Sequence, residues 1–198
     1  NISLTIWIIS LIIKPVFADV NKRHISLAFT LLAILIIQTM FFLSVANIIT
    51  ISSYSILILS LGAFIVLILL ALRRVNMEAI NELLEQENID ETFYSRPPRY
   101  NLAIFCVMLY TAIEFLFPNN SILGYLALAC MASILGILND FILKDNNILF
   151  KPFIIYMMSI LIMTASAYGF LGFDYLNEEI NALNHFRHFL TTGTYGLV

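Results

Sequence analysis

The side chains best suited to chemistry open the last apolar run of the chain, and they are His185, Arg187 and His188. A neutral imidazole is a common metal ligand and binds haem iron axially. The two histidines are three residues apart, so both can lie on one face of a helix. Arg187 can pair with a carboxylate, either a haem propionate or Glu114. This pattern predicts a metal or haem site, against the alternative of an interfacial histidine pair that ligates nothing.

Other polar or sulfur-bearing side chains inside apolar runs are further candidates. Glu114 lies near the end of one run and Asn47 near the end of another. Met158 could supply a thioether ligand to haem iron or Cu(I), although core packing explains it equally simply. Cys106 and Cys130 are expected to pack in the core. The sequence contains no P-loop, GxSxG or HExxH motif, so no catalytic residue is assigned.

These candidates sit in a chain that is too apolar for a soluble protein. Of its 198 residues, 61% are hydrophobic and 12% charged, whereas a soluble domain is roughly 45–50% apolar and about 25% charged. This excludes a soluble globular domain, a disordered chain and a nucleic-acid binder. Long runs with almost no charge are typical of transmembrane helices, and they cover residues 2–13, 26–49, 54–72, 100–117, 121–141, 152–171 and 184–198.

The predicted fold is therefore all-α, a polytopic bundle of about seven transmembrane helices in one membrane domain. Uniformly apolar runs of this length do not fit the alternating strands of a barrel. The first and last runs are shorter than the roughly 20 residues that a span needs. We expect both to be incomplete, and the chain to be an internal piece of a longer membrane protein.

Lysine and arginine alternate sharply between the connections. Nine of the ten basic residues lie in the connections around 14–25, 73–99 and 142–151, while the connections between them hold none. By the positive-inside rule, the basic connections are cytoplasmic. The last run then enters from the outer face, at the depth where Glu114 and Asn47 are expected. Intramembrane polar and ionisable groups are costly, which makes Glu114 and Asn47 candidate partners of the histidine pair.

The 73–99 connection is the one sizeable polar segment. Val75, Ala79, Ile80, Leu83 and Leu84 recur at helical spacing among glutamates, which predicts an amphipathic cytoplasmic helix. Two interpretations stay open. The segment either extends the preceding span near the membrane or serves as a docking helix for a partner.

The last stretch resembles a motif of the NnrS family, in which a histidine opens a helix and is followed by Leu-Thr-x-Gly-x-x-Gly. The residues that carry the resemblance are His188-Phe189-Leu190-Thr191-Thr192-Gly193-Thr194-Tyr195-Gly196 and, upstream, Lys151-Pro152-Phe153-Ile154-Ile155. The match covers residues 151–198. It implies a polytopic bacterial inner-membrane protein that binds haem and copper and helps to relieve nitric oxide stress.

Only His188 is carried over from the motif itself. Family members often have a histidine where this chain has Met158, so the resemblance implies a thioether or a lost ligand there. The leading hypothesis is a haem-binding membrane protein of nitric oxide defence. His188 and His185 would be ligands, Arg187 a charge partner, and Glu114 an orienting group or proton donor. Whether the protein is an enzyme stays open.

Two other classes of function remain. A transporter segment would use Gln38, Asn47 and Glu114 to line a polar path. The prolines of this chain, however, all lie at the ends of the predicted spans, whereas transporters usually have broken helices near the midplane of the membrane. A structural or assembly subunit of the membrane would carry no chemistry at all.

Overall fold

The computed structural model describes residues 3, 6–7, 9–11, 25–118, 120–142, 150–177 and 183–196. The predicted all-α class is confirmed, because the described residues form helices and contain no strand. The chain divides into two compact units, residues 1–67 and 68–198. Each unit is described by itself below.

Five helices in the described part are long and apolar enough to cross a membrane. They are α2 (Ile25–Val45), α3 (Ser53–Gln86), α4 (Pro97–Leu116), α5 (Ile122–Ile137) with the 3-10 turn η1 (Leu138–Phe141), and α7 (Pro152–Asn177). The prediction of about seven spans is too high. Most of residues 2–13 lie outside the described residues. The described part of the final run forms a short helix α8 (Leu183–Phe189) and a π-helix η3 (Leu190–Tyr195).

The first unit holds a helical hairpin made of α2 and the beginning of α3. The Ser44 hydroxyl lies 2.7 Å from the carbonyl oxygen of Ile51 and 2.8 Å from the Ser53 hydroxyl, which ties the two helices together at the turn. Asn47 ends the helical path of α2 with a φ of 57°. Asparagine tolerates this left-handed conformation better than most residues. Asn47 is exposed and shapes the turn.

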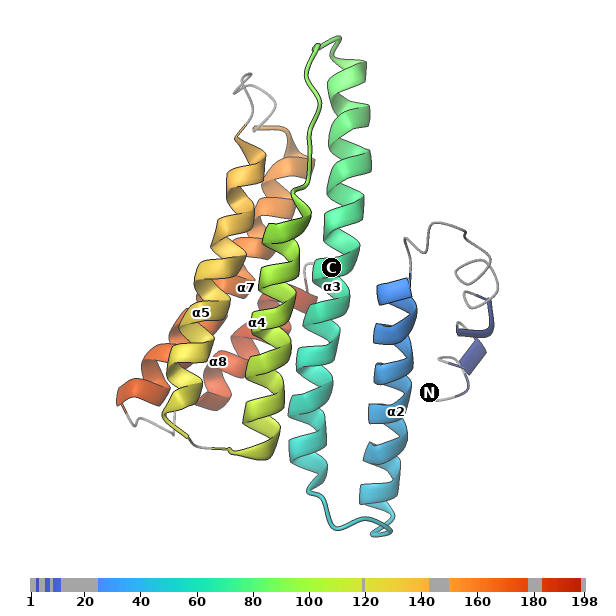
Figure 1. The fold of residues 1–198 in the computed structure, drawn as a ribbon, viewed down its shortest axis with the longest axis vertical. Coiled ribbons are helices and arrows are strands. Elements are labelled where there is room, and N and C mark those ends of the chain that lie inside the picture. Colours follow the sequence, from blue (N-terminus) through green and yellow to red (C-terminus); the bar gives the residue numbers. More distant parts are fainter. Residues whose placement is uncertain are drawn as a thin grey trace. The chain divides into compact units, whose positions relative to one another are not determined.

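The second unit is built around α5, which packs against both α4 and α7 (Figure 1). Gly124 on α5 and Gly172 on α7 allow these helices to approach closely, because a Cβ atom at Gly172 would lie 3.0 Å from the Gly124 carbonyl oxygen. Small residues at such a crossing are typical of membrane helices. Helix α8 and η3 then pack on α7. The Thr164 and Thr194 hydroxyls, 2.9 Å apart and both buried, connect α7 to η3.

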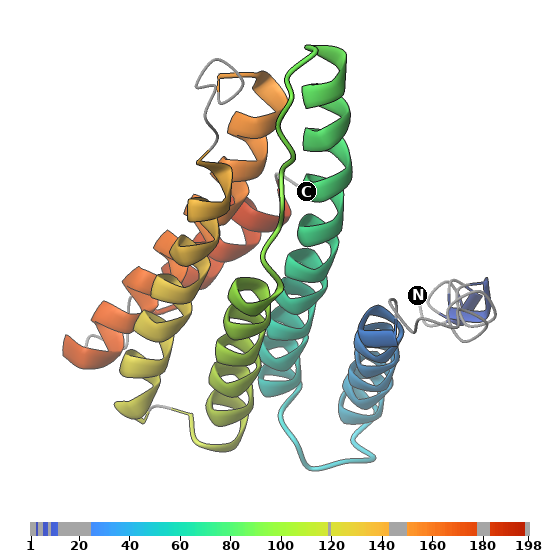
Figure 2. The same cartoon turned by 45° about the horizontal axis from the view of Figure 1, so that its top comes forward.

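Beyond its apolar part, α3 continues without a break to Gln86, and the chain from 87 to 96 then returns along it to the start of α4 (Figure 2). The Asn81 side chain holds the returning segment, since its Oδ1 accepts from the Phe93 backbone N–H at 2.7 Å and its Nδ2 donates to the Phe93 carbonyl at 3.1 Å. Ile80 and Leu84 are buried inside this unit. The helical part of this segment continues the preceding helix to Gln86, and the docking interpretation stays open.

The start of α4 is fixed by a carboxylate from another helix. Asp140 in η1 accepts the Arg96 backbone N–H on Oδ2 at 3.0 Å and the Arg99 guanidinium on Oδ1 at 2.6 Å. Its side chain is fully buried. Pro97 and Pro98 at the first helical positions have no N–H to satisfy, so one carboxylate caps this helix end and also favours its dipole.

We expect Asp140→Ala to lower the free energy of unfolding by about 1–2 kcal/mol, because it removes a helix cap and a charge-assisted hydrogen bond. Thermal unfolding in detergent, followed by circular dichroism, measures this loss. Glu78→Ala is the matched control, because Glu78 pairs with Arg74 on the surface, where such pairs are worth about 0.5 kcal/mol or less. Equal effects of the two variants would contradict the capping role.

Candidate functional site

The second unit contains a buried ion pair at the end of α4. Glu114 Oε1 accepts a hydrogen bond from Arg187 Nη2 at 2.7 Å, from the Tyr110 hydroxyl at 2.9 Å and from the Tyr175 hydroxyl at 3.1 Å. Arg187 Nη2 also lies 3.3 Å from the Tyr175 hydroxyl. Only 5% of the Glu114 side chain and 17% of the Arg187 side chain are exposed. We call these four residues the Glu114 cluster.

Three helices bring the Glu114 cluster together. Tyr110 lies one turn before Glu114 on α4, Tyr175 comes from the last turn of α7, and Arg187 from α8. A buried ion pair is tolerated only when further hydrogen bonds offset the loss of water around both charges. The two tyrosine hydroxyls supply these bonds, and the cluster therefore locks α8 to α4 and α7.

Arg187 pairs with Glu114, one of the two carboxylates considered for it from the sequence. Arg187 faces the interior on the same side of the helix as Leu190 and Thr194, which are both buried. The expected proximity of Glu114 to the start of the last helix is therefore present in the structure. With the guanidinium held by Glu114, the orientation of α8 about its own axis is fixed.

His188 follows Arg187 directly, about 100° further around α8, and is exposed, as Thr192 is. The hydroxyls of Thr191 and Thr192 both donate to the backbone carbonyl oxygen of His188, at 2.9 and 2.7 Å. This carbonyl lies near the junction between the end of α8 and the beginning of the π-helix η3. Wider turns of this kind occur frequently at functional sites.

Aromatic rings support this part of α8 against α7. The Phe170 ring on α7 stacks on Phe186, with centroids 5.1 Å apart and an interplanar angle of 16°. It also meets Phe189 edge-on at 6.2 Å. Phe170 remains half-exposed. His188 therefore projects from a helix that is held by an ion pair on one side and by stacked rings on another.

Of the remaining predicted site residues, only Met158 is described in the same unit as His188, and it does not lie beside it. Met158 is half-buried near the start of α7. Tyr175, which contacts Arg187, lies roughly 25 Å further along that helix at 1.5 Å per residue. Asn47 belongs to the first unit. The side chain of His185 lies outside the described part.

A complete protein ligand set for a bare metal ion is absent from the described residues, which contain no group of three or more His, Cys, Asp and Glu side chains. The arrangement does offer one exposed imidazole on a fixed helix.

Tyr110 and Tyr175 are cluster residues that the sequence analysis missed. Their types alone give no signal, because tyrosine is common in membrane helices as a packing residue. The spacing of Tyr110 and Glu114, four residues apart on one helix face, is the one local sign that could have linked a hydroxyl to the acid.

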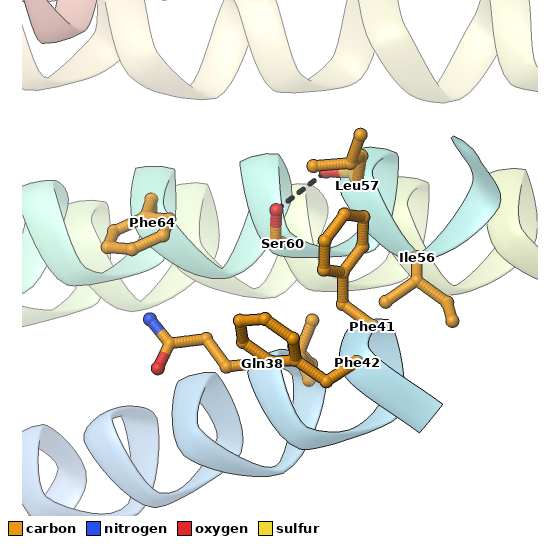
Figure 3. Close-up of a pocket in the computed structure, with 8 residues that line it drawn as sticks. Gln38, Phe41, Phe42, Ile56, Leu57, Ser60 and Phe64 are labelled. Atoms are coloured by element: carbon orange, nitrogen blue, oxygen red, sulfur yellow. Dashed lines mark hydrogen bonds between the residues drawn. The ribbon is translucent and has the colours of Figure 1, made fainter. Parts of the chain in front are cut away.

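A separate cavity of about 180 Å³ lies between α2 and α3 in the first unit (Figure 3). Its wall is apolar except for Gln38 and Ser60, and the Ser60 hydroxyl donates to the Leu57 carbonyl oxygen at 2.7 Å. The other lining residues are Ile37, Phe41, Phe42, Ile56, Leu57 and Phe64. This lining does not have the polar character of a solute path.

Comparison with known proteins identifies a family. A family model described as NnrS protein matches residues 1–198, which is the whole chain. No curated protein and no solved structure matches the chain.

Proposed function

The chain belongs to the NnrS family, and from this premise we propose that it is a haem-binding, multi-pass membrane protein of the nitric oxide stress response. His188 is the proposed axial ligand, with His185 as a second ligand or hydrogen-bond partner. We further propose that the protein lies in a bacterial inner membrane, with its basic connections on the cytoplasmic side.

The observation that carries this proposal is the exposed imidazole of His188 beside an arginine that is fixed by the Glu114 cluster. A helix that cannot rotate keeps the His188 side chain on one face of the unit, where it would be available to hold the haem group. The nearby Phe170, Phe186 and Phe189 rings add apolar aromatic surface of the kind that a flat macrocycle contacts.

Haem fits these residues better than copper does. A copper ion needs several protein ligands, and the described residues supply no cluster of them. Haem iron needs only one or two protein ligands and, when bound, offers a coordination position to a small diatomic gas. Nitric oxide is small and apolar enough to enter the bilayer, so a site at membrane depth is accessible to it.

Glu114 has a different role in this proposal from that of a ligand. Every hydrogen bond that the structure gives to Glu114 ends on Oε1, from Arg187 and the two tyrosines. Glu114 therefore positions α8 and, through it, His188. Arg187 balances the charge of Glu114 through its Nη2 group.

We expect His188→Ala to abolish, or to reduce at least tenfold, the Soret absorbance that the purified protein acquires with added haemin, because the variant lacks the axial nitrogen. The spectrum of the protein in detergent measures this. His24→Ala is the matched control, since it removes a histidine that the sequence places among basic residues. A wild-type protein without a Soret band, or an unchanged band in His188→Ala, would overturn the proposal.

The physiological half of the proposal is tested in cells. We expect cells that express His188→Ala to grow as poorly under a nitric oxide donor as cells without the protein, while His24→Ala restores growth. Immunoblotting of membranes keeps the protein levels comparable. Full protection by His188→Ala would separate the stress response from this histidine.

A further inference from the structure

Three arginines lie in the second unit, where the apolar part of α3 ends and α4 begins. Residues 53–72 of α3 carry no charge, and Arg73 follows them directly. Arg96 and Arg99 come immediately before the apolar run of α4. A membrane helix changes from apolar to basic residues at the level of the lipid headgroups. We therefore expect all three arginines at that level.

One buried carboxylate and one tyrosine hydroxyl join these arginines into a single site. Asp140 Oδ1 lies 2.6 Å from Arg99 Nη1 and 4.0 Å from Arg96 Nε. Arg73 and Asp140 both lie near enough to the Tyr100 hydroxyl to act on it electrostatically. We call Arg73, Arg96 and Arg99 the arginine group.

The arginine group carries more positive charge than its carboxylate offsets. Among the described residues, Asp140 is the one acidic partner of Arg96 and Arg99, and Arg73 forms no ion pair. Three positive charges therefore face one negative charge. The Arg96 side chain is 63% exposed and that of Arg99 is 29% exposed, whereas Asp140 is fully buried. The excess positive charge is thus accessible from outside the protein.

The chemistry of the site points to a phosphate that carries apolar chains. A guanidinium has five N–H donors and matches the oxygens of a phosphate well. Asp140 takes one nitrogen of Arg99, so donors remain for a second anion. Beyond Arg99, the side chains of Leu102 and Phe105 on α4 are more than half exposed. A soluble anion would leave this apolar surface uncovered, whereas acyl chains would cover it.

We propose that the arginine group binds the phosphate of an anionic phospholipid whose acyl chains lie against the exposed apolar side of α4. Asp140 holds Arg99 and also caps α4, so the site is tied to the folded structure. The lipid offsets the excess positive charge at the start of α4. The site is independent of His188, and it applies whichever side of the membrane holds the basic connections.

Two neighbouring arginines of α3 provide a matched test. Arg73 belongs to the arginine group, whereas Arg74 already pairs with Glu78 on the surface. Native mass spectrometry of the purified full chain in detergent, titrated with phosphatidylglycerol, measures the affinity. We expect Arg73→Gln to weaken binding about fivefold, and Arg74→Gln to weaken it about twofold or less. Equal losses would mean that the lipid responds to net charge alone, and would overturn the proposal.

A second variant tests the site from α4. Arg96→Gln keeps the backbone N–H that Asp140 accepts, so the start of α4 stays capped. We expect about a fivefold loss of affinity for phosphatidylglycerol, with the unfolding midpoint measured by circular dichroism unchanged. Wild-type affinity in Arg96→Gln would overturn the proposal.

Two other probes test the chemistry of the occupant on the wild-type protein. Phosphatidylcholine has no net charge, and we expect it to bind at least about tenfold more weakly than phosphatidylglycerol. Equal affinity for the two lipids would contradict recognition of an anionic headgroup. Inorganic phosphate at the same concentration is expected not to displace phosphatidylglycerol, because it covers no apolar surface. Displacement would assign the site to a soluble anion and overturn the lipid as its occupant.

Discussion

Removal of either partner of the buried ion pair is expected to destabilise the protein strongly. We expect Arg187→Ala and Glu114→Ala each to lower the free energy of unfolding by about 3–5 kcal/mol, because each leaves one charge buried without its partner. The side chains are 17% and 5% exposed, so neither charge can easily regain water. Thermal or denaturant unfolding in detergent, followed by circular dichroism, measures the loss.

The double variant Arg187→Ala/Glu114→Ala discriminates pairing from simple packing. If the charges stabilise each other, the double variant is no less stable than the worse single variant, because no charge is left unpaired. Arg74→Ala with Glu78→Ala is the matched control, since that pair joins residues four apart on an exposed helix face. Strictly additive losses at Arg187 and Glu114 would contradict the coupling.

A further variant, Glu114→Gln, separates an effect on stability from an effect on the proposed haem binding. Glu114 touches α8 through Arg187 and not through His188. Under the proposal, Glu114→Gln, which keeps an acceptor oxygen, retains a Soret band whose position or width changes as His188 loses its fixed orientation. Under the proposal, Glu114→Gln therefore disturbs the positioning of a ligand, whereas His188→Ala removes the ligand itself.

The membrane-spanning helices were predictable from the sequence because the signal is strong and local. Apolar runs near 26–49, 54–72, 100–117, 121–141 and 152–171 became α2, α3, α4, α5 with η1, and α7. The two terminal runs carried the same composition in fewer residues, and composition alone overstated the number of spans. The π-helical turn after His188 could not be anticipated, since hydropathy does not depend on how the backbone closes its hydrogen bonds.

The charged residues of the candidate site could be predicted from the sequence, but the tyrosine hydroxyls that bind them could not. Placing Glu114 and Arg187 at one depth needed only the alternation of basic connections and the cost of a buried charge. Tyr110 and Tyr175 could not be assigned in this way, because a tyrosine in a span packs well whether or not its hydroxyl finds an acid. The same holds for Asp140, whose role at the start of α4 depends on a contact 44 residues away in the sequence.

The close approach of α5 and α7 depends on glycines. Their role can be recognised in the sequence only when it is already known that these two helices pack together. Gly172→Ala is expected to lower the free energy of unfolding by about 1–3 kcal/mol, as overpacking does. Its Cβ atom would lie 3.0 Å from the Gly124 carbonyl oxygen and 2.9 Å from Leu128 Cγ. The carbonyl belongs to the helix backbone and cannot swing away, so the two helices must separate. Unfolding in detergent measures the loss.

Two other glycines of the same helices turn this into a graded test. Gly169→Ala should cost less than Gly172→Ala, because its Cβ atom would meet only the flexible thioether of Met131. Gly136→Ala is the control, since nothing lies within 4 Å of the added atom, and alanine is favoured in helices by about 0.5–1 kcal/mol. We therefore expect Gly136→Ala to stabilise the protein slightly. A reversed order among the three would mean that α5 and α7 do not pack through these glycines, and that α7 does not hold Tyr175 against Glu114 by this contact.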